Sequence, residues 1–167
     1  MVRMQRLWAN LFGGWFQLSR RFPAALLDEM AAVIAAGERN HLGEIRFALE
    51  SRLAPLEVLG GLDAATRARQ VFTQLRVWDT ELNSGVLLYV LIAEQRIEIV
   101  ADRGISAKVA PREWEAVCAR MHESYARGEW RAGSLAGIIA ASDLLTRHFP
   151  GEGKSNPDEL PDRPVLL

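Results

Sequence analysis

The feature that most constrains the fold is an unbroken apolar run in the middle of the chain, Gly85-Val-Leu-Leu-Tyr-Val-Leu-Ile-Ala93. The run has the length of a strand and falls far short of the roughly 20 apolar residues that a membrane-spanning helix needs. A strand that is apolar at every position is buried, whereas a half-solvated strand alternates between apolar and polar residues. The run therefore predicts a buried strand within a sheet.

A second strand follows the apolar run almost at once. Only Glu94-Gln95 separates the run from Arg96-Ile-Glu-Ile-Val-Ala-Asp102, which alternates between polar and apolar residues. Such tight spacing predicts a β-hairpin with a two-residue turn. In that pairing Ala93 would face Arg96, and Leu87 would face Asp102.

Hydrophobic periodicity places the remaining elements. Strict alternation in residues 41–50 predicts a strand whose drier face carries Ile45, Phe47 and Leu49. Residues 51–62, which include Pro55 and Gly60-Gly61, are predicted to form a loop or a short turn. Apolar residues at helical spacing predict four helices: 23–37 starting at Pro23, 63–75 capped by Asp63, 111–127 starting at Pro111, and 131–148. A strand-helix-strand unit followed by a hairpin predicts a small mixed sheet covered by helices.

The chain is long enough for one domain, which we place at residues 23–150. Residues 1–22 form an N-terminal arm rich in arginine and aromatic residues. The arm either packs its aromatic side chains onto the domain or forms an interfacial element that touches anionic lipid or a membrane partner. Residues 150–167 hold four prolines and two glycines, and we expect the tail from 151 to 167 to be disordered.

Composition excludes several classes of protein. The formal net charge of -1 provides no field that would favour nucleic acid. Cys118, as the single cysteine, cannot form an internal disulfide, and its helical spacing predicts a small buried hydrophobe. His41, His122 and His148 show no pair at metal-ligand spacing, so we expect them at the surface or at caps. The sequence also lacks GxGxxG, P-loop, GxSxG, CxxC and HExxH motifs.

The hairpin brings two polar segments to the same end of the sheet. One is Arg76-Val-Trp-Asp-Thr-Glu-Leu-Asn-Ser-Gly85, which precedes the buried strand, and the other is Asp102-Arg-Gly104, which follows its partner. Together they would gather four oxygen-bearing side chains beside Arg103, namely those of Asp79, Glu81, Asn83 and Asp102.

A cluster of this kind favours a hard cation. Two carboxylates about 4 Å apart repel each other by about 4 kcal/mol at an effective dielectric constant of about 20. Ca²⁺ relieves such repulsion because it accepts carboxylate, amide and backbone oxygens in a flexible geometry. The alternative is that these residues cap turns, pair with Arg76 or Arg103, and face water.

The same segments resemble a known family. The resemblance rests on Arg69-Gln-Val-Phe, on Val77-Trp-Asp-Thr-Glu-Leu-Asn-Ser-Gly-Val-Leu-Leu-Tyr-Val-Leu-Ile-Ala, and on Ile97-Glu-Ile-Val-Ala-Asp-Arg-Gly-Ile105. His41-Leu-Gly-Glu-Ile-Arg-Phe and Gly128-Glu-Trp-Arg-Ala-Gly extend it, so that it covers roughly residues 23–150. Together these segments resemble the TPM domain family, in particular its short bacterial branch, whose members lack a signal peptide and a transmembrane tail.

The resemblance carries expectations about fold and function. It implies a three-layer α/β/α sandwich with a Rossmann-like core, and it maps the family's acidic site onto residues 79–83 and Asp102. Family members are described either as calcium binders or as acid phosphatases. We therefore expect a cytoplasmic, non-catalytic module with a weak calcium site, and a metal-assisted phosphatase as the alternative. Relatives often neighbour LemA-like genes, which implies a membrane-associated partner, with further membrane contact through residues 1–22.

Overall fold

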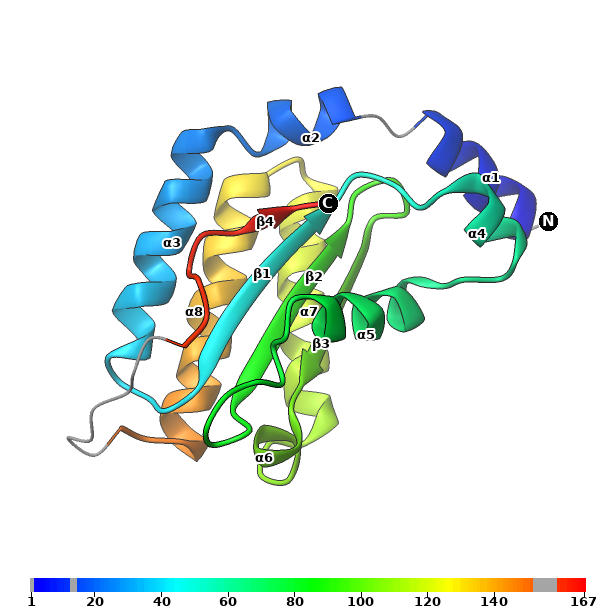
Figure 1. The fold of residues 1–167 in the computed structure, drawn as a ribbon. Helices are drawn as coiled ribbons and strands as arrows, with labels where there is room; N and C mark the ends of the chain where they lie inside the picture. The colour runs from blue at the N-terminus through cyan, green and yellow to red at the C-terminus, as the bar shows by residue number, and fades with distance from the viewer. Residues whose placement is uncertain (1, 13–14, 152–158) are drawn as a thin grey trace.

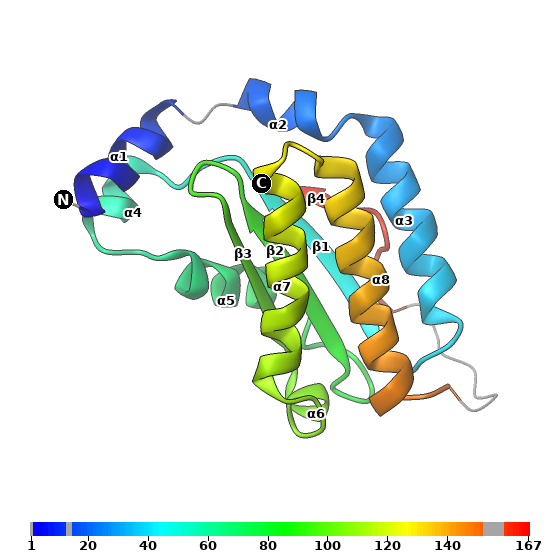
Figure 2. The same cartoon turned by 180° about the vertical axis from the view of Figure 1, so that it is seen from behind.

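The computed structural model describes residues 2–12, 15–151 and 159–167, and it has the expected α/β/α layers. Four strands form one sheet in the order β3-β2-β1-β4, with β1 parallel to β2 and to β4 and with β3 antiparallel to β2. Helices α3, α7 and α8 cover one face and α5 covers the other (Figures 1 and 2). The strands are β1 (Glu44–Glu50), β2 (Gly85–Leu91), β3 (Arg96–Ala101) and β4 (Val165–Leu166). The helices are α1 (Val2–Phe12), α2 (Trp15–Arg21), α3 (Ala24–Glu38), α4 (Pro55–Leu59), α5 (Ala64–Gln74), α6 (Arg103–Ser106), α7 (Pro111–Ala126) and α8 (Trp130–His148).

Capping residues and prolines start several helices at the positions that the sequence predicts. The side chain of Asp63 accepts a hydrogen bond from the Thr66 backbone N–H and so caps α5. Pro111 occupies the first turn of α7, where its missing N–H costs nothing. Residues 51–62 are not wholly a loop, because Pro55 starts the short helix α4 within them. Among the described residues, no helix is both long enough and apolar enough to cross a membrane.

Strand β1 is buried on both faces, although its sequence predicts one drier face. Ile45, Phe47 and Leu49 pack against α3 and α8 as expected. The opposite face carries Glu50, whose carboxylate is covered by α5. Arg67 of α5 donates hydrogen bonds from Nε and Nη2 to this carboxylate at 2.8 Å, and the Tyr89 hydroxyl donates another at 2.5 Å. The polar residue tolerates burial because its charge is paired and fully hydrogen-bonded.

The hairpin forms, but its register differs from the predicted one by two residues. Leu91 pairs with Arg96, so residues 92–95 make the turn and not Glu94-Gln95 alone. The backbone N–H of Ile92 donates to Glu50 of β1, and Gln95 has a left-handed φ of 52°, which lets the longer turn close. A shift of two residues keeps every side chain on its expected face. It places Asp102 opposite Gly85, whose carbonyl accepts the Asp102 N–H at 2.8 Å.

The C-terminal tail is ordered where the structure describes it, which corrects the expectation of disorder for residues 159–167. Leu160 is buried in the core beneath α5, and Val165 pairs with Ala48 at the edge of β1. The Arg46 guanidinium donates hydrogen bonds to the carbonyl oxygens of Pro161 and Arg163. Pro161 and Pro164 therefore lie just before an edge strand, a position that tolerates them. Residues 152–158 lie outside the described residues.

A buried carboxyl group lies beneath this tail. Glu38, at the end of α3, accepts the Ile45 N–H at 2.7 Å and shares a hydrogen bond with Asp162. Burial is the main cause that raises the pKa of Glu38 to about 9, and the nearby charges of Glu44 and Asp162 raise it further. The folded protein therefore keeps a proton on Glu38 that the unfolded chain releases at neutral pH.

We predict that the Glu38→Gln variant is less sensitive to alkaline pH than the wild type. The pKa of Glu38 rises on folding from 4.5 to about 9, so wild-type stability falls as the pH rises through this window. Glutamine keeps the acceptor for Ile45 without the charge. Thermal unfolding should show a higher Tm for the variant at about pH 9 and a smaller gain at about pH 5. A Tm difference that is the same at both pH values, or that is shared by the exposed control Glu115→Gln, would contradict this.

Candidate functional site

The candidate site lies at the end of the sheet where β2 begins and β3 ends, which is the lower end in Figure 1. The connection from α5 to β2 meets α6 there at Gly104, where an added Cβ atom would lie 2.6 Å from the Asn83 carbonyl oxygen. Gly85 lets the same connection fold back against the start of β2, since a Cβ atom there would lie 1.9 Å from the Val77 carbonyl oxygen. No larger residue fits at either position.

The loop that carries the oxygen-bearing side chains is shaped by two residues with left-handed backbones. Arg76 has a φ of 53° and Asn83 a φ of 52°. Asparagine tolerates this region better than most residues, because its short polar side chain can bond locally. Between them Thr80 is buried, and its hydroxyl accepts the Ser84 N–H at 2.9 Å. The loop is therefore held in one conformation by its own contacts.

The structure brings two of the four predicted residues, Asn83 and Asp102, together beside Arg103. Asp102 caps α6, with Oδ1 accepting the Arg103 N–H at 2.7 Å. The Arg103 side chain donates from Nε to Oδ1 of Asn83 at 2.9 Å, and the Gly104 N–H donates to the Asn83 carbonyl at 3.1 Å. The second carboxylate oxygen of Asp102, Oδ2, is buried and has no hydrogen-bond partner in the described structure. An unpaired buried carboxylate oxygen is costly, so Oδ2 is where a ligand would gain most.

Asp79 and Glu81 occupy the same loop but are exposed. The Glu81 backbone N–H donates to the Glu159 carboxylate at 3.0 Å, which ties the loop to the C-terminal tail. No group of three or more His, Cys, Asp or Glu side chains within residues 2–12, 15–151 and 159–167 is arranged to hold a metal ion. The four predicted residues thus share one end of the sheet without forming a closed cage.

Sequence reasoning missed two polar residues beside this site. The Ser84 hydroxyl is buried and, in the described structure, has no partner. Glu44, at the start of β1, is fully buried, and its backbone N–H donates to the Ser84 carbonyl at 3.1 Å. Its carboxylate accepts the N–H groups of Glu159 and Leu160 at 3.3 Å. In the parallel pairing of β1 with β2, Glu44 lies opposite Gly85. Predicting that pairing from the sequence would have placed Glu44 and Ser84 at this end of the sheet.

The histidines and the cysteine have their contacts elsewhere. His41 is fully buried, which contradicts its expected surface position, and burial lowers its pKa to about 4, so its ring is neutral. Its Nδ1 lies 2.9 Å from the Gly43 carbonyl, whereas His148 lies 3.3 Å from Glu113 and His122 is exposed on α7. Cys118 is half-buried, and burial raises its pKa to about 11, so its thiol stays protonated.

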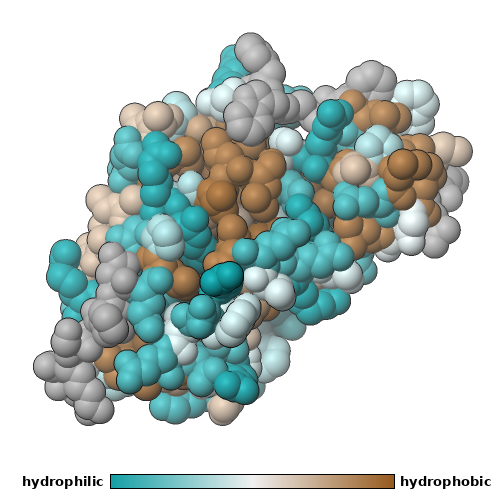
Figure 3. Space-filling view, in the orientation of Figure 1, coloured by the Kyte–Doolittle hydropathy of each residue, from teal (hydrophilic) through white to brown (hydrophobic). Residues whose placement is uncertain are grey.

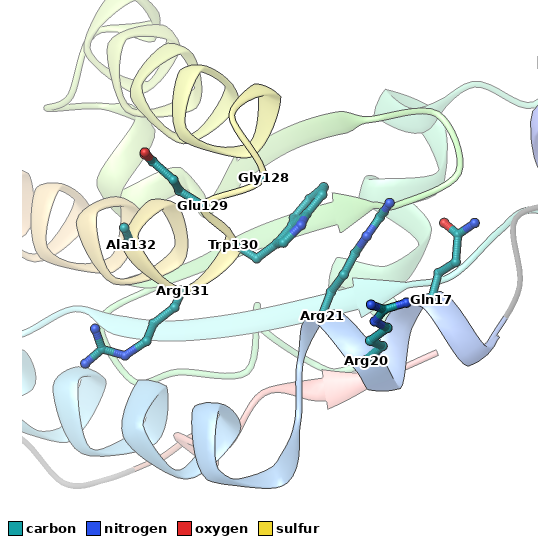
Figure 4. A pocket seen from close by; sticks show the side chains of 8 residues that line it. All are labelled: Gln17, Arg20, Arg21, Gly128, Glu129, Trp130, Arg131 and Ala132. Carbon is teal, nitrogen blue, oxygen red and sulfur yellow. The ribbon is translucent and has the colours of Figure 1, made fainter.

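The main grooves of the molecule lie away from Asp102. One of about 910 Å³ runs between β3 and α7, and another of about 710 Å³ lies between α2 and the turn that joins α7 to α8 (Figure 4). Neither is lined by Asp102, Asn83 or Ser84. The candidate site is therefore separate from both of these grooves.

Comparison with known proteins agrees with this arrangement. The NMR structure of the BA42 protein from the psychrophilic bacterium Bizionia argentinensis superposes with a TM-score of 0.76. It shares 29% sequence identity with this chain, and the match covers 86% of this chain and 94% of that one. No curated protein sequence matches. The family model for the TPM domain matches residues 22–144, which span both strands of the hairpin and the loops of the candidate site. The chain is therefore a member of the TPM domain family.

Proposed function

We propose that this TPM domain is a non-catalytic binding module that holds a divalent cation where the loop before β2 meets Asp102. The observation that carries the proposal is the buried, unpartnered Oδ2 of Asp102. Oδ1 of the same carboxylate is already used in capping α6, which fixes the direction of Oδ2. A cation bound there would compensate a charge that the described structure leaves unpaired on that side.

The chemistry of the surrounding groups favours calcium. The same end of the sheet carries the amide oxygen of Asn83, which Arg103 links to α6, and the unpartnered hydroxyl of Ser84, both hard oxygen donors. Asp79 and Glu81, exposed on the same loop, are the further carboxylates that we assign to the ion. Ca²⁺ tolerates irregular oxygen shells of this kind, whereas Mg²⁺ demands a near-ideal octahedron. A site with one fixed carboxylate and two exposed ones binds weakly, because the exposed side chains of Asp79 and Glu81 must be immobilised around the ion.

Arg103 already supplies positive charge at the site. Its guanidinium bonds Asn83 at 2.9 Å and holds the loop against α6 without a metal ion. A divalent cation would compete with this side chain for the amide oxygen and would be repelled by its charge. We therefore assign to Arg103 the role of keeping the affinity for calcium low.

We favour binding over phosphate-ester hydrolysis because of the groups around Asp102. Metal-assisted phosphatase chemistry uses a positioned nucleophile or water and usually a proton donor. In the described part of the chain, the hydrogen bonds of His41 and His148 go to Gly43 and Glu113, and neither imidazole is hydrogen-bonded to Asp102 or to the loop before β2. The phosphatase reading stays the alternative, and it is tested with the same variants.

We predict that calcium stabilises the wild type and does not stabilise Asp102→Asn. Asparagine is as good an N-cap as aspartate, so the variant keeps the start of α6 and loses only the charge. At a calcium concentration about 100 times the Kd, binding contributes about 2.7 kcal/mol, which raises Tm by several degrees in a chain of this size. Differential scanning fluorimetry with Ca²⁺, with Mg²⁺ and with EDTA measures the shift.

The matched control for this experiment is Asp143→Asn, which removes an exposed carboxylate on α8 and leaves the loop and α6 unchanged. It should respond to calcium as the wild type does. If calcium raised the Tm of Asp102→Asn as much as that of the wild type, the proposed site would be wrong. It would also be wrong if millimolar calcium left the wild-type Tm unchanged. Release of phosphate from a model phosphomonoester by the wild type but not by Asp102→Asn would replace the binding module with the phosphatase.

We further predict that Arg103→Gln binds calcium several-fold more tightly than the wild type. The substitution removes a positive charge beside the ion and frees the Asn83 amide oxygen. Calcium titration followed by isothermal calorimetry gives both dissociation constants, and Arg112→Gln, at the exposed start of α7, serves as the control. Weaker calcium binding by Arg103→Gln would show that the guanidinium positions the loop for the ion and does not compete with it.

A further inference from the structure

Helix α1 is amphipathic, and it turns the polar residues Arg6 and Asn10 toward the protein together with Leu7, which packs against the core. Asn10 is fully buried, with its Oδ1 accepting the Leu53 N–H at 2.7 Å and its Nδ2 donating to Glu94 at 2.8 Å. Arg6 forms two hydrogen bonds to the Glu94 carboxylate, at 2.8 and 2.9 Å, and a third at 2.6 Å to the Leu62 carbonyl. A surface helix of a globular protein ordinarily presents its apolar side to the core.

The outward side of α1 is apolar. Met4, Trp8 and Leu11 follow helical spacing, and their exposed fractions are 62%, 55% and 42%. Helix α4 packs beside α1 and adds Leu56 and Leu59, which are 81% and 56% exposed. We call these five residues the outer apolar face. Figure 3 shows apolar colour gathered at the end of the molecule formed by α1 and α4.

The polar contacts of α1 fix this orientation. Rolling the helix to bury its apolar side would withdraw Arg6 from Glu94, whose side chain is only 8% exposed, and would leave the Leu53 N–H without Asn10. Both losses are costly, because a buried charge or donor without a partner loses its full solvation. The helix is therefore held with its apolar side in water, and exposed apolar patches of this kind mark interaction sites.

The charge around the outer apolar face indicates what covers it. Residues 1–27 contain four arginines and no aspartate or glutamate; one of the four, Arg6, is paired with Glu94, and α4 adds the exposed Glu57. Arg52, which is exposed, bonds the Leu11 carbonyl at the rim of the face. On α2, Arg20 forms no ion pair within the described structure, and Arg21 lies over the Trp130 ring at 4.3 Å, beside the groove in Figure 4. A second copy of the chain would bring these arginines against each other, whereas anionic lipid would neutralise them.

We propose that α1 and α4 dock on the surface of an anionic lipid bilayer. Trp8 and Leu11 then enter the boundary between headgroups and acyl chains, and Arg20 of α2 and Arg52 lie against lipid phosphates. This surface is at the opposite end of the sheet from Asp102 (Figure 1), so the proposal does not rest on the cation site.

The test is flotation of the full chain with vesicles of phosphatidylcholine, with and without about a quarter of phosphatidylglycerol. We expect binding to the anionic vesicles, little binding to the neutral ones, and weakening in high salt. The variant Trp8→Gln/Leu11→Gln should partition into the anionic vesicles about tenfold less than the wild type, or even less. The reason is that two apolar side chains no longer enter the bilayer. Both residues are exposed, so circular dichroism and Tm should match those of the wild type.

The matched control is Trp78→Gln/Ile139→Gln. It removes one tryptophan and one aliphatic side chain that are outside the outer apolar face and are 48% and 51% exposed. It should bind the vesicles as the wild type does. Three results would overturn the proposal: no binding of the wild type to anionic vesicles, equal losses in the two double variants, or a wild-type dimer in solution that Trp8→Gln/Leu11→Gln converts to a monomer. The last result would assign the outer apolar face to a second copy of the chain.

Discussion

The structure depends on one constraint, the complete burial of the parallel pair β1 and β2. Every residue of both strands is buried, so the pair needs cover on both faces and a partner at each outer edge. Helices α3, α7 and α8 cover one face and α5 the other, while β3 and β4 complete the edges. Burial also dictates the polar contacts, because Glu50 and Arg46 of β1 need the partners that α5 and the C-terminal tail provide.

The same pair of strands separates two surfaces with different chemistry. At the start of β2, backbone contacts at Gly85 and Gly104 bring Asn83, Asp102 and Arg103 together. At the other end, Glu94 in the hairpin turn holds Arg6 of α1. The seven residues of β2 span roughly 20 Å, so an ion at one end and a membrane at the other can be bound at the same time.

Much of this arrangement could be predicted from the sequence, because local signals agreed with the fold. The apolar run from Gly85 and the cap at Asp63 placed their elements correctly, and the hairpin brought Asp102 toward Asn83 despite a register error. The register was missed because Glu94-Gln95 has no turn signature and the left-handed Gln95 belongs to a longer turn. Tertiary contacts decided the rest: composition indicated disorder near Leu160, whereas the free edge of β1 and the buried Arg46 keep that segment in place.

The calcium site at Asp102 is the central claim, and residue-resolved NMR tests it most directly. Titrating calcium into the isotope-labelled protein should move the amide signals of residues 79–85 and 102–104 and leave those of α1 and α8 in place. The same titration of Asp102→Asn should move none of these signals. The account would be contradicted if millimolar calcium moved only the amide signals of Glu38 and Glu44, whose buried carboxyl groups lie beneath the tail. It would also be contradicted if no amide signal moved.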